Sequence, residues 1–335
     1  MKTKPTMKDL AKACGVSWPT VSYVFNNSRP VSPKTRELVF SKAREIGYVP
    51  DVLARGLATK RSYTIGILFS GFNYSTSVPI FVAIEEAARL YNYRLVLGLQ
   101  GAAPAAALAD LQDLTARRMD GIIFVSATDN LDSTVIAALE AATIPILLAY
   151  TSPPDLASLD SILPDQTQGG LIATRHLLSR GRRKLAFIGA SEDNNATGKR
   201  LAGFRLAHKE LNLQVDPALI RFAGYSAVEG RKAALDIMQN DMPDGVFAAD
   251  DNIAAGVLQA CALKGVKVPQ DLSVIGFDNS IICSVTLPQI TSVAMPFGVI
   301  GQYCLDRLVY RLQNPDEWTP DQKLLACEIV HRETA

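Results

Sequence analysis

The stretch KDLAKACGVSWPTVSYVFNNS, Lys8 to Ser28, decides how the first part of the chain folds. Three apolar residues recur at the spacing that places side chains on one face of a helix: Leu10, Ala11 and Cys14. Gly15 suits the left-handed position that ends a helix, and Ser17 is a good N-cap for the next one. The pattern predicts two short helices, 7–14 and 17–25, joined by a tight turn.

A third amphipathic pattern covers residues 33–46 and has four apolar positions on one face: Leu38, Val39, Ala43 and Ile46. The second helix turns Val21 and Val24 inward, so that three apolar faces form one small core. The spacing of Ala11, Gly15 and Val21 is typical of a helix-turn-helix, because small residues let two helices cross closely and an apolar residue fixes the second helix.

The second helix carries aromatic residues where an ordinary surface helix carries Lys and Glu. Its outer face holds six residues: Trp18, Pro19, Thr20, Ser22, Tyr23 and Asn26. In a helix-turn-helix this face enters the DNA major groove, where aromatic rings pack on thymine methyl groups. The alternative is that Trp18 or Tyr23 packs on the third helix. Small polar residues are predicted to contact phosphates: Ser17, Thr20, Ser22, Asn26, Ser32 and Thr35.

The formal net charge of +1 conceals an uneven distribution. Residues 1–61 hold twelve Lys and Arg against four Asp and Glu, a formal charge of +8, and the remainder carries −7. Because Lys and Arg neutralise phosphates with release of counterions, a basic segment on an acidic body suggests a polyanionic partner. A solvated run of charges is the alternative explanation.

The rest of the chain alternates strand-like and helix-like segments. The expected strands are TIGILF, RLVLG, GIIFV, IPILLA, KLAFIG, DGVFAA and LSVIGF. The expected helices include residues 80–91, 105–117, 167–179, 199–211, 228–239 and 253–264. Such alternation predicts doubly wound parallel sheets, and about 270 residues are too many for one such sheet, so two similar lobes are expected.

Composition and motifs exclude several classes of protein. No run near 18 apolar residues occurs, so neither a membrane span nor export is expected. The five cysteines form no C-x-x-C pair, which favours a reducing cytoplasm. The histidines, His176, His208 and His331, lie in different elements without metal-ligand spacing, and no catalytic or phosphate-binding motif occurs. We therefore expect no catalytic residue, metal or cofactor.

Four segments, TMKDLAKACGVSWPTVSYVFNN, VSPKTRELV, EIGYVPDVLARGLAT and RSYTIGIL, resemble the DNA-binding head and hinge of the lactose/galactose repressor (LacI/GalR) family, and the similarity extends to EIVHRET. The resemblance implies a bacterial homodimer that binds a pseudo-palindromic double-stranded operator under control of a small effector. Tyr23, Asp51 and the pair Trp18-Pro19 depart from the family pattern, so a different operator sequence is expected. A sugar-binding module, the rival hypothesis, would explain the body but not the basic head.

The resemblance also implies the domain organisation. A helical DNA-binding domain covers residues 1–50, a hinge 51–62, and a periplasmic-binding-protein-like α/β core 63–335 of two doubly wound lobes joined by three crossovers. The final helix, 297–312, returns to the first lobe. We expect the first lobe to comprise about 63–163 and 293–322, and the second lobe about 164–292 and 323–335.

Effector-binding residues are implied by the same resemblance at Arg200, Asp251, Asp278 and Asp165, which follow expected strands. Carboxylates and an Arg suit a sugar or similar polyol, while Tyr225 or Phe72 would cover its apolar ring face. A nucleobase or nucleoside is the less favoured alternative. Asp251 has a second possible role, as N-cap of a helix that begins at Asn252.

The hinge is expected to couple the two parts. Residues 52–59 are only two helical turns long and contain Gly56, so they should not form a stable helix without DNA. The resemblance assigns Leu57 to a wedge in the minor groove, with Ala54 and Ala58 small enough for two copies of the helix to pack together. A simple linker is the alternative.

Overall fold

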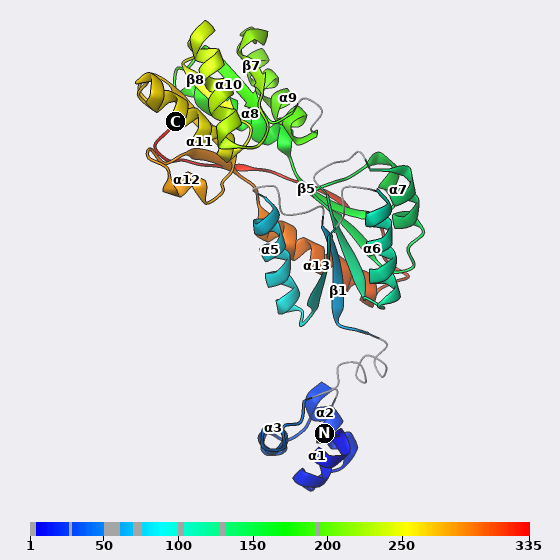
Figure 1. Cartoon of the computed structure of the whole chain (residues 1–335). Helices are drawn as coiled ribbons and strands as arrows, with labels where there is room; N and C mark the ends of the chain where they lie inside the picture. Colours follow the sequence, from blue (N-terminus) through cyan, green and yellow to red (C-terminus); the bar gives the residue numbers. More distant parts are fainter. Residues whose placement is uncertain are drawn as a thin grey trace. The chain divides into compact units, whose positions relative to one another are not determined.

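A computed structural model describes residues 5–26, 29–49, 61–69, 76–99, 104–126, 131–191 and 195–335. The chain forms two compact units, Met1–Ser62 and Tyr63–Ala335, here called the head and the core (Figure 1). Residues 51–60 of the expected hinge, with Ala54, Leu57 and Ala58, lie outside the described residues.

The head contains the three expected helices, α1 (Met7–Cys14), α2 (Trp18–Asn26) and α3 (Pro33–Ile46). Thr6 and Asp9 form a capping box at the start of α1, and Gly15 ends that helix with φ 64°. One expectation was wrong: Leu38 is 40% exposed rather than buried. Among the described residues of the head, the buried hydrophobic cluster consists of Leu10, Ala11, Cys14, Val21, Val24, Val39, Ala43 and Tyr48.

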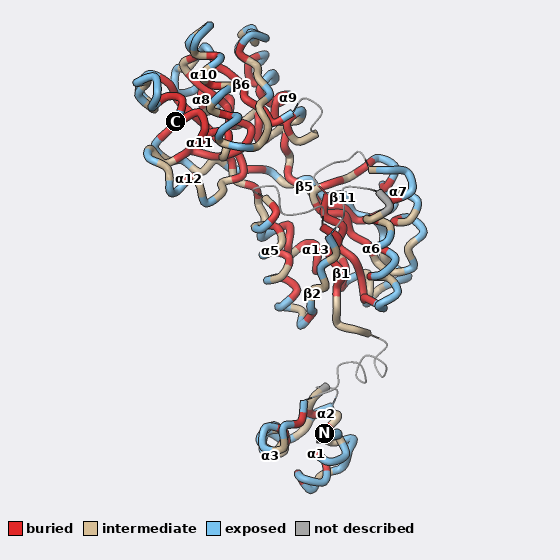
Figure 2. Tube along the Cα trace, viewed as in Figure 1, coloured by how far each residue is buried: buried red, intermediate tan, exposed pale blue. Residues whose placement is uncertain are grey.

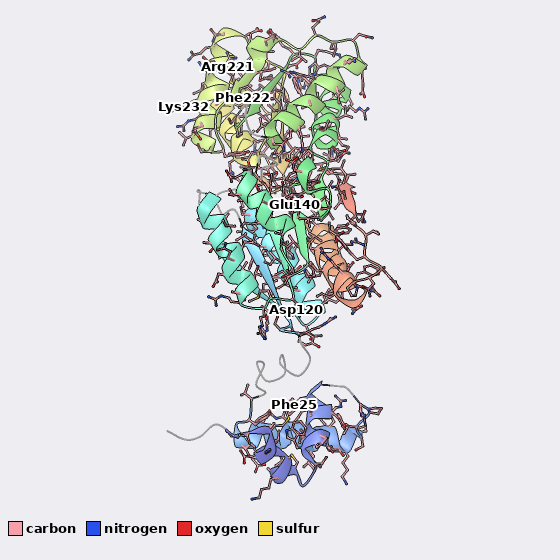
Figure 3. All side chains as sticks on the ribbon, turned by 90° about the vertical axis from the view of Figure 1, so that its right-hand side faces the viewer. Phe25, Asp120, Glu140, Arg221, Phe222 and Lys232 are labelled. Carbon is pink, nitrogen blue, oxygen red and sulfur yellow. The ribbon has the colours of Figure 1, made fainter. Side chains whose placement is uncertain are left out.

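Aromatic packing completes the head core. Phe25 (labelled in Figure 3) meets Phe40 edge-on at 5.4 Å between ring centres and Tyr48 at 5.6 Å. Edge-to-face contacts of this kind add to the stabilisation that burial of the rings provides. Tyr48 therefore ties the segment after α3 back to the end of α2.

The first lobe of the core is built on six parallel strands in the order β2-β1-β3-β4-β5-β11. The strands are β1 (Thr64–Phe69), β2 (Arg94–Leu99), β3 (Gly121–Val125), β4 (Ile146–Ala149), β5 (Asp160–Pro164) and β11 (Gln322–Leu325). The helices are α5 (Ser77–Leu90), α6 (Pro104–Ala116), α7 (Ser133–Glu140) and α13 (Phe297–Gln313), with a 3-10 turn at Pro154–Leu156. Helices α5 and α13 pack on one face of the sheet, and α6 and α7 on the other.

The second lobe has a six-stranded sheet in the order β12-β10-β9-β8-β6-β7, in which only the β10–β12 pair is antiparallel. The strands are β6 (Leu185–Gly189), β7 (Ile220–Phe222), β8 (Gly245–Ala248), β9 (Ser273–Asp278), β10 (Thr291–Ala294) and β12 (Glu328–Val330). The helices are α8 (Gln166–Ser179), α9 (Asn195–Glu210), α10 (Ala227–Asn240), α11 (Asp251–Lys264) and α12 (Ile282–Val285), with a 3-10 turn at Pro217–Leu219. The sheet lies between α8 and α9 on one face and α10 and α11 on the other.

The chain passes between the two lobes three times. The passages lie at Asp165, at Met295 and Pro296, and at Ala326 and Cys327. Pairing places β10 in the second sheet and β11 in the first, whereas the expected division put residues 293–322 in the first lobe and 323–335 in the second. The fold class, a helix-turn-helix head with two parallel-sheet lobes, is confirmed.

The start of the core is tied to the first sheet. Asp120 (labelled in Figure 3), just before β3, accepts a hydrogen bond from the backbone N–H of Tyr63 at 3.0 Å, and its own N–H donates to the carbonyl of Thr64 at 2.9 Å. Tyr63 has φ 51°, in the left-handed region. These bonds set the direction in which the chain enters β1.

Burial follows the two sheets. Figure 2 shows the buried residues concentrated on the strands of both lobes and on the helix faces that cover them. In the part of the chain that the structure describes, no helix is long and apolar enough to cross a membrane.

Candidate functional site

The start of α2 exposes its outer face. Trp18 is 52% exposed, and Pro19 is exposed beside it. About half of the Trp18 surface is therefore open to solvent. Tyr23 is half-buried, and the Arg29 guanidinium lies 5.2 Å from the centre of its ring. Trp18 is thus free to contact another molecule, while Tyr23 already has a neighbour within the head.

The candidate phosphate-contacting hydroxyls sit at helix N-termini. Ser17 Oγ accepts from the backbone N–H of Thr20 at 3.3 Å, and the two hydroxyls are 2.8 Å apart. Ser32 Oγ accepts from the N–H of Thr35 at 3.1 Å, again with hydroxyls 2.8 Å apart. Helix N-termini favour anions, so these caps lie where phosphates would bind. Ser22 is half-buried, and the side chain of Asn26 lies outside the described residues.

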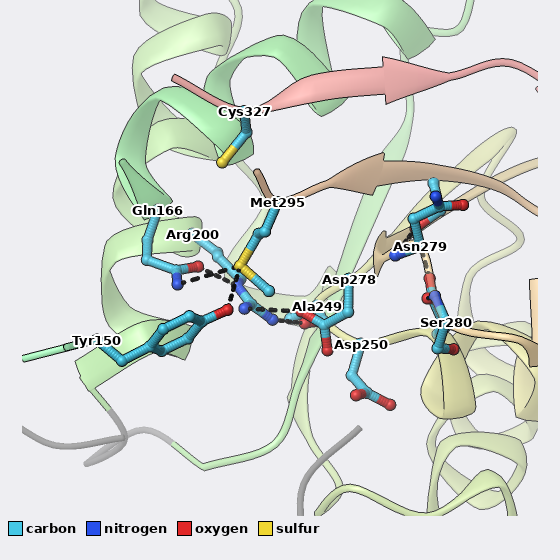
Figure 4. Close-up of polar contacts among 12 residues, drawn as sticks. Tyr150, Gln166, Arg200, Ala249, Asp250, Asp278, Asn279, Ser280, Met295 and Cys327 are labelled. Carbon is cyan, nitrogen blue, oxygen red and sulfur yellow. Dashed lines mark hydrogen bonds and ion pairs between the residues drawn. The ribbon is translucent and has the colours of Figure 1, made fainter. Parts of the chain in front are cut away.

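In the core, the polar side chains converge on Arg200, which is 4% exposed. Its Nε donates to Gln166 Oε1 at 2.8 Å and its Nη2 to Asp278 Oδ1 at 3.1 Å, while Nη1 donates to the carbonyl of Ala249 (Figure 4). The guanidinium also lies 3.7 Å from the ring centre of Phe277. Ala249 follows β8 and Asp278 ends β9, so the cluster occupies the carboxyl ends of neighbouring parallel strands, the usual ligand position in such sheets.

Two glycines bring Arg200 to this place. A side chain at Gly170 on α8 would collide with the carbonyl of Arg200, and one at Gly203 on α9 would collide with the carbonyl of Thr167. The two helices therefore approach each other at backbone distance. This close packing places Arg200 of α9 beside Gln166 at the start of α8.

The first lobe contributes Tyr150, which follows β4 with φ 70°. Its hydroxyl donates to Met295 Sδ at the second crossover (Figure 4). Its ring stacks parallel to that of Phe297 with 6.2 Å between ring centres. Burial, with Asp278 nearby, raises the pKa of Tyr150 well above its usual value. Tyr150 therefore stays a neutral hydrogen-bond donor and links the first lobe to the cluster around Arg200.

The two neighbouring aspartates have different roles from those expected. Asp250, not Asp251, is the N-cap of α11, accepting from the N–H groups of Asn252 and Ile253. The alternative that Asp251 caps this helix was therefore wrong. Continuing the register of β8 and β9 beyond their last pair brings Asp250 level with Asp278. Asp251 instead bonds to Ser280 and Ser292, beyond the end of β9 and on β10.

The remaining candidates have other contacts or lie outside the described residues. Asp165 is the N-cap of α8 and accepts from the N–H of Gln168 at 2.8 Å. Tyr225 packs against the hydrophobic cluster between the second sheet and α10 and α11. Phe72 lies outside the described residues. The structure brings together Arg200 and Asp278, whereas Asp251 accepts hydrogen bonds from Ser280 and Ser292.

Four residues of the cluster were missed by sequence reasoning: Tyr150, Gln166, Asp250 and Met295. Tyr150 and Gln166 do follow first-lobe strands, β4 directly and β5 by two residues, which is a signal that could have been used. Among the residues that the structure describes, no group of His, Cys, Asp and Glu side chains is arranged to hold a metal ion. Arg200, Asp278 and Gln166 carry the hydrogen-bond donors and acceptors that a polar organic molecule needs.

Comparison with known proteins gives two family matches. The family described as "Bacterial regulatory proteins, lacI family" matches residues 6–51, and "Periplasmic binding protein-like domain" matches residues 174–335. The HTH-type transcriptional regulator DegA of Bacillus subtilis is 32% identical over 299 residues, 89% of this chain and 88% of that protein.

Solved structures agree with these matches over almost the whole chain. The crystal structure of the Lac repressor dimer bound to operator and the anti-inducer ONPF has a TM-score of 0.82 and 28% identity, and covers 99% of both chains. The complex of the transcriptional regulator CelR with cellobiose has a TM-score of 0.73 and 26% identity, and covers 99% of this chain and all of that one. The similarity thus includes the head as well as the core.

Proposed function

The chain belongs to the lacI family of bacterial regulatory proteins. From that membership we propose which residues bind DNA, which bind the effector and which couple the two events. It is a DNA-binding transcriptional regulator, not an enzyme, with a helix-turn-helix head and an effector-binding core. It binds double-stranded operator DNA as a homodimer, as the Lac repressor does. We propose that it represses transcription, and that it works in the cytoplasm where the DNA is.

The exposed start of α2 is the proposed reading surface. Trp18 and Pro19 would meet base edges, because the first residues of the second helix enter the major groove deepest. Tyr23 is a second reader, held by Arg29. The capped N-termini of α2 and α3 at Ser17 and Ser32 would grip phosphates and position the head without reading sequence.

The proposed effector site is the cluster around Arg200, and the buried Arg200–Asp278 pair is the observation that carries it. Asp278, Asp250 and Gln166 offer acceptors for hydroxyl groups, and Arg200 offers donors in a planar fork. The similar regulator CelR binds cellobiose, which supports a sugar or sugar derivative as the effector. We propose Asp250 in place of Asp251 as the ligand-facing carboxylate.

A thermal-shift screen tests this site. Neutral mono- and disaccharides, nucleobases and nucleosides are each added to the full chain, and hits are measured by calorimetry with wild type and Asp278→Asn. We expect a sugar hit whose affinity falls by about 1 to 3 kcal/mol in the variant, because a buried polar group of the complex loses its partner. Unchanged affinity would place the effector elsewhere, and a nucleobase hit would overturn the sugar assignment.

The hinge, residues 51–62, is the proposed link between effector and DNA. Leu57 would enter the minor groove only when two hinge helices form side by side in the dimer, with Ala54 and Ala58 at their contact. Gly56→Ala should then tighten operator binding and blunt the effector response, because Ala favours the helix by about 1 kcal/mol. Gel shifts on operator and random DNA test the wedge. If Leu57→Ala loses affinity equally on both, the hinge is only a tether.

A further inference from the structure

Asp251 is fully buried at the first position of α11 and binds neighbours on two other elements. Its Oδ2 accepts from the backbone N–H of Ser280 at 2.6 Å, and its Oδ1 accepts from Ser292 Oγ at 2.6 Å. A side chain at Gly276 on β9 would collide with the carboxylate. The fold thus leaves space at position 276 so that Asp251 can lie against the end of β9.

The turn that Asp251 holds is strained. Asp278 has φ 102° and Asn279 has φ 52°, both in the left-handed region that side chains rarely adopt. Ser292 Oγ accepts from the N–H of Asn279 at 3.1 Å while it donates to Asp251. Two consecutive backbone N–H groups, those of Asn279 and Ser280, are therefore fixed by Asp251 directly or through one hydroxyl.

This turn carries the carboxylate that pairs with Arg200. Asp278 Oδ1 lies 3.1 Å from Arg200 Nη2, and both side chains are 5% exposed. A strained turn keeps such a conformation only when its surroundings hold it. We propose that Asp251 is a positioning residue of the effector site: in its ionised form it holds the turn Asp278–Ser280 so that Asp278 faces Arg200, and its protonation releases that turn.

The groups that act on Asp251 come from every element packed around it. Burial raises the pKa of Asp251 to about 6, an effect opposed by hydrogen bonds from Ser292, Ser280 and Cys283 and reinforced by the charge of Asp250. The thiol of Cys283 on α12 has its own pKa raised by burial and by Asp251, so it remains neutral. Arg332 binds the far side of the turn, donating to Asn279 Oδ1 at 2.6 Å.

The test reads the Arg200–Asp278 pair without any effector. In the full chain labelled with ¹⁵N-arginine, exchange with water of the Arg200 Nη2–H that donates to Asp278 is measured by NMR from pH 8 to pH 5. The Nη2–H of Arg307, which donates to Asp160 Oδ1 at 2.6 Å in the first lobe, serves as internal reference for the intrinsic pH dependence of exchange. Arg200→Lys and Arg307→Lys assign the two signals.

In wild type we expect the ratio of Arg200 to Arg307 exchange to rise about tenfold as pH falls through about 6, since a neutral carboxyl accepts more weakly than a carboxylate by about 1.4 kcal/mol. In Asp251→Asn the ratio should be high at pH 8 and independent of pH, because one of the two carboxylate oxygens, each of which accepts a hydrogen bond, becomes an NH₂ group that cannot accept. A flat ratio in wild type, or a ratio in Asp251→Asn equal to that of wild type at pH 8, would overturn the role.

Because this role rests on the proposed effector site, the experiments must distinguish a failure of the role of Asp251 from a failure of the effector-site assignment. The exchange ratio involves no ligand, so a flat ratio removes the role of Asp251 and leaves the effector site standing. Unchanged sugar affinity in Asp278→Asn removes the effector site and leaves the exchange result standing. If Asp251→Asn does not fold, the pH profile of wild type alone still decides.

Discussion

The head and the cluster around Arg200 use polar side chains in opposite ways. Ser17 bonds to Thr20 and Ser32 to Thr35, each three residues along the chain and exposed to solvent. Arg200 bonds to groups 34, 49 and 78 residues away, all of them buried. The difference teaches that exposed residues of the head can be substituted without loss of its fold. The buried residues around Arg200 instead form the proposed binding site and also stabilise the core.

The largest expected effect follows from this double role. Arg200→Ala should destabilise the core by about 3 to 5 kcal/mol, because it leaves the carboxylate of Asp278 buried and uncompensated. Urea unfolding followed through the helical signal of the core measures this loss. The variant should also lose its response to the effector, so the two losses must be recorded on the same protein.

A matched ion pair on the surface supplies the control. Arg175 pairs with Glu210 between the same two helices, but the two side chains are 53% and 43% exposed. Arg175→Ala should change stability by less than about 1 kcal/mol because solvent screens exposed pairs. Similar losses in both variants would break the contrast between a buried cluster and an ordinary surface.

The next effect separates folding from reading within the head. Trp18→Ala should leave head stability within about 0.5 kcal/mol of wild type, since the side chain is half exposed, and should weaken operator binding by about 1 to 3 kcal/mol. Leu10→Ala, at a fully buried position, should lower stability by about 2 to 5 kcal/mol. Amide exchange of α1–α3 and binding-site selection measure the two properties. An unchanged consensus for Trp18→Ala would remove it as a reader.

The same contrast explains how much the sequence could predict. The helices 7–14 and 33–46 were predicted to the residue because caps, glycines and apolar spacing are local signals. Strand β5 was missed because its first residue, Asp160, is buried and charged. Asp160 is matched by Arg307 and by the indole N–H of Trp318, both about 150 residues later. Local patterns cannot reveal a partner that only the fold supplies.

The effector site shows the same limit in its two neighbouring aspartates. From the sequence ADDNIAAG either carboxylate fits the end of a strand or the cap of a helix. The structure assigns the cap to Asp250 and ties Asp251 to Ser280 and Ser292, residues from other elements. Arg200 and Asp278 were predicted because they directly follow motifs that family resemblance identifies. Tyr150 and Met295 meet only where the chain crosses between lobes.

A smaller effect tests the helix caps of the head. Ser32→Ala should destabilise α3 by about 1 kcal/mol through loss of the N-cap, and should weaken binding to all DNA sequences alike. Ser226→Ala, which removes the cap of α10 in the core, is the matched control for stability. It should cost a similar amount without any effect on DNA. A change of base preference in Ser32→Ala would make Ser32 a reader instead of a phosphate contact.

The smallest expected effect is that, as pH falls, Asp251 makes the core more stable whereas Asp9 makes the head less stable. Burial raises the folded-state pKa of Asp251 to about 6, above its unfolded value near 4, so the folded core binds this proton more tightly than the unfolded chain. Its contribution to stability is therefore lost as pH rises from about 4 to about 6 and regained as pH falls. Hydrogen bonds with Thr6 lower the pKa of Asp9 in the head, so its contribution is present above about pH 4 and lost as pH falls through the lowered value.

Amide exchange measures the unfolding of each unit at pH 7, 5 and 3.5 in wild type, Asp251→Asn and Asp9→Asn. The comparison distinguishes a gain of core stability on acidification from a loss of head stability. On acidification from pH 7 to pH 5, wild-type core should gain stability relative to Asp251→Asn, because only wild type has a carboxyl to protonate there. On further acidification to pH 3.5, wild-type head should lose its advantage over Asp9→Asn. Since Asp9 is exposed, this loss should be small. If the stability of the wild-type core does not change relative to Asp251→Asn between pH 7 and pH 5, ionisation of Asp251 does not destabilise the folded core. The strained turn at Asp278 would then have to be stabilised by groups other than Asp251.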